Sequence, residues 1–69
     1  MQTRFGFLVH LPGLGGPVLV VARDPAFAHD LTRKGGQARS LGNVPAPAGA
    51  VAYFRRIAGV QPLAVISPD

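Results

Sequence analysis

The chain has 69 residues, with seven lysines and arginines, three acidic residues and a formal net charge of +4. This length allows one domain at most, and such a domain buries only about 60% of the surface of its unfolded chain, so its core is small. There is no cysteine, which excludes disulfides and thiolate metal sites, and from two histidines and three acids we expect no structural metal and no cofactor.

The composition is apolar with a modest positive bias. Only 14% of residues are charged and 48% are hydrophobic, whereas a typical domain is about 25% charged. The bias favours acidic protein surfaces or polyanions as partners. No apolar run approaches the roughly 20 residues of a membrane span, and the N-terminus lacks the pattern of a signal peptide. We therefore expect a cytoplasmic protein, and a core this small favours oligomerisation or docking on a partner.

The N-terminal third predicts a β-hairpin. Residues 3–11 alternate between large apolar side chains and mostly polar or small ones, the period of a strand with one buried face. Residues 12–17, with the sequence PGLGGP, form the loop, and Leu14 is expected to be exposed at its tip. Residues 18–22, VLVVA, lack polar alternation, which predicts a strand covered on both faces.

Two helices are expected. Asp24 suits an N-cap and Pro25 the first helical position, so the first helix is predicted over 25–34, with a basic last turn and a glycine stop. The second helix is predicted from about Pro47 to Ala58, because its apolar residues recur at helical spacing.

The remaining segments complete a single small α+β domain spanning residues 1–69. Residues 37–41 fit either a short extra edge strand or coil. Residues 62–66, PLAVI, predict a last strand, and we favour residues 3–11 as its neighbour. The predicted order is ββααβ, with a three-stranded, mainly antiparallel sheet and two helices.

No residue pattern predicts catalysis. His10 and His29 have no acid or nucleophile placed beside them by the sequence. Asp24 is expected to cap a helix, and the remaining acids offer no carboxylate pair. We therefore expect a protein that is not an enzyme and has no small-molecule substrate.

Basic residues and one apolar face are the candidate binding sites. The basic candidates are Arg33, Lys34, Arg39, Arg55 and Arg56. Tyr53 adds an aromatic ring beside the last two, a combination that suits nucleic acids and protein hot spots alike. Solvated helix surface is the simpler explanation of each basic cluster, and the sequence leaves open whether they form one patch.

The apolar candidate is the sheet face that stays bare if both helices pack on the same side. Its residues would be Leu8, Leu19 and Val21, and an exposed apolar face of this kind marks an interaction surface. The alternative is one helix on each face. Lysine substitutions at each of residues 18–22 distinguish the two arrangements. If one face is bare, lysine at every second position unfolds the domain, and lysine at the positions between them leaves it folded but abolishes partner binding. If both faces are internal, all five substitutions unfold the domain.

These features predict a small non-enzymatic binding protein that docks on a macromolecular partner. It would act as an inhibitor, adaptor or accessory subunit, including those of phage or mobile elements. The expected partner is a protein with an acidic surface, or a second copy of the chain in a homodimer. The alternative is a nucleic-acid-binding protein that uses the basic patch.

Overall fold

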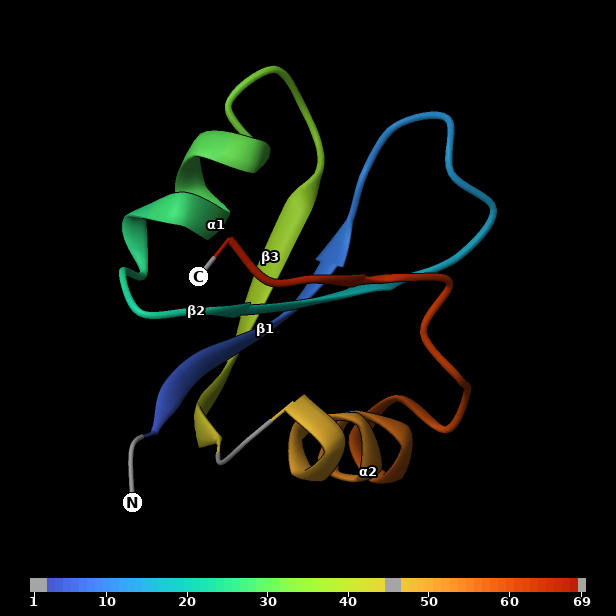
Figure 1. Cartoon of the computed structure of the whole chain (residues 1–69). Coiled ribbons are helices and arrows are strands. Elements are labelled where there is room, and N and C mark those ends of the chain that lie inside the picture. Colours follow the sequence, from blue (N-terminus) through green and yellow to red (C-terminus); the bar gives the residue numbers. More distant parts are fainter. Residues whose placement is uncertain (1–2, 45–46, 69) are drawn as a thin grey trace.

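The computed structural model describes residues 3–44 and 47–68, and these residues form one mixed four-stranded sheet and two helices (Figure 1). The strands are β1 (Arg4–His10), β2 (Val18–Ala22), β3 (Gln37–Val44) and β4 (Val65–Ile66). The helices are α1 (Ala26–Leu31) and α2 (Pro47–Ala58). The strand order is β3-β1-β2-β4. The small α+β class is confirmed.

The third and fourth strands differ from the prediction. The edge-strand alternative for 37–41 is confirmed, and the strand extends to residue 44. The sheet therefore has four strands instead of the predicted three, and the order is ββαβαβ instead of ββααβ. Because β3 occupies the free edge of β1, the last strand pairs with β2 in parallel. The expected pairing of that strand with residues 3–11 is therefore wrong, and only the last two residues of 62–66 lie in β4.

Each helix connects two strands that run in the same direction. β1 is antiparallel to both β2 and β3, so β2 and β3 are parallel to each other, and α1 links them. α2 likewise links β3 to β4, which is parallel to β2. The two crossovers run in opposite directions across the sheet, and crossovers of the same hand then place their helices on opposite faces. α1 and α2 do lie on opposite faces (Figure 1).

The two faces carry separate apolar cores. The core beneath α2 consists of Leu8, Leu19, Val21, Leu41, Val44, Ala50 and Phe54. The core beneath α1 consists of Val9, Val20 and Ala22, with Phe7, Leu11, Phe27, Leu31 and Ile66 packed against it. No residue of β2 is more than 2% exposed, which confirms the predicted burial on both sides of that strand.

The predicted hairpin is confirmed, with Val9 opposite Val18 and Leu14 49% exposed in the connecting loop. α1 is shorter than the predicted 25–34, and the expected N-cap is wrong by one position, because the helix begins at Ala26 with Pro25 as its N-cap and Asp24 before it. It ends at Leu31, and both the backbone N–H and the hydroxyl of Thr32 donate to the carbonyls of Ala28 and His29 at 3.1–3.2 Å, which closes the last turn.

A β-bulge distorts β3. Ser40 and Gly42 pair with consecutive residues of β1, so Leu41 is an extra residue in the ladder. Gly42 has a φ of +79°, and its N–H donates to the Ser40 hydroxyl oxygen at 3.1 Å. The bulge lets Leu41 and Val44, three residues apart, both enter the core beneath α2.

Asp24 supports the start of α1, and we expect Asp24→Ala to lower the free energy of unfolding by about 1 kcal/mol. Its carboxylate Oδ1 accepts from the Ala26 N–H at 3.0 Å, and its carbonyl accepts from the Phe27 N–H at 3.1 Å. Urea denaturation measures the change. Asp30→Ala is the control, because Asp30 makes only an exposed 3.7 Å ion pair with Arg33 and should be nearly neutral. Equal losses in the two variants would contradict the role of the Asp24 carboxylate at the start of α1.

Candidate binding site

The predicted cations do not form one patch. Arg33 and Lys34 follow the C-terminal end of α1, whereas Arg55 and Arg56 lie on α2, on the opposite face of the sheet (Figure 1). Arg33 also lies 3.7 Å from Asp30 in an exposed ion pair. The first basic cluster is therefore separated from the second by the sheet itself.

Arg39 belongs to the α2 side. It lies directly opposite Leu8 on the neighbouring strand, and paired residues share a face of the sheet. Since Leu8 packs beneath α2, Arg39 projects on the same side. A hollow of about 230 Å³ is lined there by Leu8, His10, Gln37, Ala38 and Arg39. We use the name basic α2 surface for Arg39, Tyr53, Arg55 and Arg56.

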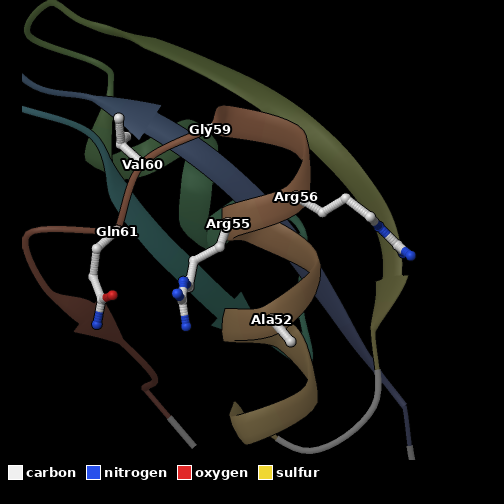
Figure 2. A pocket seen from close by; sticks show the side chains of 6 residues that line it. All are labelled: Ala52, Arg55, Arg56, Gly59, Val60 and Gln61. Atoms are coloured by element: carbon white, nitrogen blue, oxygen red, sulfur yellow. The ribbon is translucent and has the colours of Figure 1, made fainter.

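The C-terminal half of α2 borders an open hollow of about 410 Å³ (Figure 2). It is lined by Ala52, Arg55, Arg56, Gly59, Val60 and Gln61. Figure 2 shows the side chains of Arg55 and Gln61 on one side of the helix and Arg56 extending to the other, across β3 in this view. Consecutive helical residues diverge by about 100°, so the two guanidinium groups suit two separated acceptors rather than one ion.

Tyr53 orients Arg56. The guanidinium carbon of Arg56 lies 5.2 Å from the centroid of the Tyr53 ring, within cation–π range. Residues three apart are neighbours on a helix surface, so the pair is held by α2 alone. The two arginines also lie in the last turn of α2, where positive charge stabilises the helix dipole. Helix stabilisation alone explains why the two arginines lie in the last turn. It leaves their outward-facing N–H groups able to donate to a partner.

The predicted apolar docking face is wrong. Leu8 is 8% exposed, and Leu19 and Val21 are fully buried in the core beneath α2. The reason is topological, since the crossover from β3 to β4 places α2 over this face. The exposed apolar side chains that sequence reasoning missed include Val60, Leu63 and Val65. They lie in a stretch, residues 57–68, that contains no ionisable side chain, and this absence was the available signal.

The remaining polar candidates are dispersed. His10 ends β1 and His29 lies on α1, and both are exposed. Asp24 supports the start of α1 and Asp30 pairs with Arg33, while Asp69 lies outside the described residues. Among residues 3–44 and 47–68, no three histidine or acidic side chains gather where a metal ion could bind. No helix in this part of the chain is long and apolar enough to cross a membrane.

The chain matches no protein-family model, no curated protein and no solved structure.

Proposed function

We propose that this chain is a small non-enzymatic, cytoplasmic binding protein that docks on the acidic surface of a protein partner through the basic α2 surface. The observation that carries the proposal is the end of α2. There Arg55 and Arg56 extend to opposite sides of the helix, Arg56 lies over the Tyr53 ring, and the 51% exposed Val60 lines the same hollow as the two arginines. Arginine and tyrosine are among the residue types that are enriched in protein hot spots.

The positions of the acids support binding rather than catalysis. The carboxylate of Asp24 accepts a backbone N–H at the start of α1, and that of Asp30 pairs with Arg33. Neither carboxylate is set beside a histidine or hydroxyl as a general acid or base requires. The proposed roles are those of an inhibitor, adaptor or accessory subunit, including those of phage or mobile elements, all of which act by docking.

The division of the cations favours a protein partner over a nucleic acid. The basic α2 surface holds three arginines, while Arg33 and Lys34 lie on the other side of the sheet. Three cations suit a few carboxylates on a folded partner. Nucleic-acid binding remains the second candidate because Arg56 stacked on Tyr53 is also an arrangement that suits bases and phosphates.

We expect charge reversal on α2 to abolish partner capture. The variant Arg55→Glu/Arg56→Glu places carboxylates against an acidic surface, where like charges cost several kcal/mol. The measurement is quantitative mass spectrometry of proteins captured from cell lysate by the wild type and by the variant. Arg33→Glu/Lys34→Glu is the matched control, because it makes the same charge change on the other side of the sheet. The proposal requires proteins that are lost with the first variant and retained with the control, and equal losses would contradict it.

A labelled single-stranded DNA of mixed sequence tests the second candidate. Under the protein proposal, fluorescence anisotropy should show no saturable binding at physiological salt. Binding through all five cations would instead fall with salt at a slope of about −3.5 in log K against log salt. Tight binding with that slope would replace the protein proposal with nucleic-acid binding.

A further inference from the structure

The two edges of the sheet differ in how well they resist pairing with another strand. β3 carries the charged Arg39, an extra residue at Leu41 and the left-handed Gly42, all of which disfavour addition of a strand. β4 has no charged residue, bulge or left-handed residue, and its outer edge pairs with no strand in the described residues. It is two residues long, so a strand added there would form a short ladder, and side-chain contacts beside it would supply most of the buried area.

Exposed apolar side chains gather beside β4. Leu63 and Val65 are 57% and 42% exposed. The loop between β1 and β2 lies next to them, since the Leu63 N–H donates to the Pro17 carbonyl at 2.9 Å and the side chain of Leu63 lies against Gly16. Figure 1 shows this loop and the chain entering β4 on the same side of the molecule. We use the name uncharged edge for Leu14, Leu63 and Val65.

The two segments that form the uncharged edge lack charged side chains. Residues 11–22 and 57–68 contain no ionisable side chain, although the chain as a whole carries +4. Arg39 lies on β3, at the other edge of the sheet from β4, and Arg55 extends on the same side of α2 as Gln61 (Figure 2). The apolar part of this surface therefore carries no cation of its own, so a second positively charged molecule meets less repulsion there than at the basic α2 surface.

We propose that the occupant of the uncharged edge is a second copy of this chain, with the two β4 strands pairing antiparallel about a two-fold axis. Such an interface is self-complementary, because Leu63 and Val65 of each copy meet the same residues of the other. It would join two four-stranded sheets into one of eight strands. An unrelated basic or acidic partner gains no charge attraction at this edge, whereas the small core of a 69-residue chain gains directly from burial against a copy of itself.

Sedimentation velocity tests the dimer from low to high micromolar concentration. The wild type should pass from monomer to dimer, and more readily at high salt, because salt screens the repulsion between two chains of charge +4. Leu63→Lys places two ammonium groups beside the two-fold axis and should raise the dissociation constant about tenfold or more. Ala38→Lys, the same charge at the exposed β3 edge, should leave it unchanged. Circular dichroism shows whether each variant is folded.

Single-cysteine spin labels test the geometry, since the chain has no cysteine of its own. Labels at Ala64→Cys should lie close together in the dimer. Labels at Ala38→Cys should be separated by seven strand spacings of about 4.8 Å, or about 34 Å. A wild type that stays monomeric at high micromolar concentration would overturn the proposal. So would a dimer in which the Ala38 labels are the closer pair. Neither result bears on the basic α2 surface, which is tested separately by charge reversal.

Discussion

Lysine at Leu19 and lysine at Val20 are each expected to unfold the domain. Both side chains are fully buried, Leu19 in the core beneath α2 and Val20 in the core beneath α1. Neither core contains a buried polar or charged residue among the described residues, so the ammonium group would have no partner. An unpaired charge in an apolar core costs several kcal/mol, comparable with the roughly 5 kcal/mol that holds a small domain folded. Far-UV circular dichroism and urea denaturation measure the loss.

Gln37→Lys is the matched control, because it adds the same side chain at an exposed strand position and should unfold at the same urea concentration as the wild type. The two core variants report on different helices. If Leu19→Lys keeps a cooperative unfolding transition, α2 does not cover its face of the sheet. If Val20→Lys keeps one, the α1 face is open. If only one of the two core variants unfolds the domain, one face of the sheet is bare, as the sequence favoured.

The hairpin and α2 could be predicted because their signals are local. The alternation in 3–11, with a glycine- and proline-rich loop after it, predicts a hairpin without reference to the rest of the chain. The stripe containing Ala50 and Phe54 does the same for α2, and both residues are fully buried. These segments agree with the prediction because local pattern and tertiary packing point the same way. The single buried face predicted for the first strand of the hairpin is wrong, because Leu8 and Val9 are buried on opposite faces of β1 while Phe5 is 37% exposed.

β3 could not be predicted in full because little of it is buried. Only Leu41 and Val44 of its eight residues are buried, and the bulge separates them by three positions instead of two. The strand is therefore specified by its hydrogen bonds to β1 rather than by its own pattern. The wrong prediction for the last strand has the same cause, because β4 pairs with β2 when β3 already occupies the free edge of β1.

The sequence proposes the residues of the candidate site, but it does not predict how they are arranged. Arg55, Arg56 and Tyr53 are adjacent in sequence, so a helix brings them together whatever the fold. Whether Arg33 joins them depends on which face each helix covers, and that depends on the direction of two crossovers, which no local pattern reports. Sequence reasoning also sought an exposed apolar surface in the middle of the sheet, whereas the structure places it beside the edge strand.

The start of β3 depends on Gly36, and we expect Gly36→Ala to lower the free energy of unfolding by about 2–4 kcal/mol. Gly36 has a φ of +106°, which strains any residue with a Cβ, and an added Cβ would lie 2.5 Å from the carbonyl oxygen of His10. That oxygen belongs to the backbone of β1 and cannot move aside as a flexible side chain could. The next residue, Gln37, pairs with His10 and begins the ladder between the two strands. The methyl group would therefore push β3 away from β1 at its first pair.

Gly42→Ala separates the two causes. Gly42 also has a positive φ, +79°, but an added Cβ there would meet nothing within 4 Å. This variant should show only the cost of the backbone conformation, about 1–2 kcal/mol. Urea denaturation of both gives the cost of the close approach to His10 as their difference. Equal losses would mean that the turn relaxes around the new methyl group. In that case the register of β3 would be held by Leu41 and Val44 in the core rather than by the turn that precedes the strand.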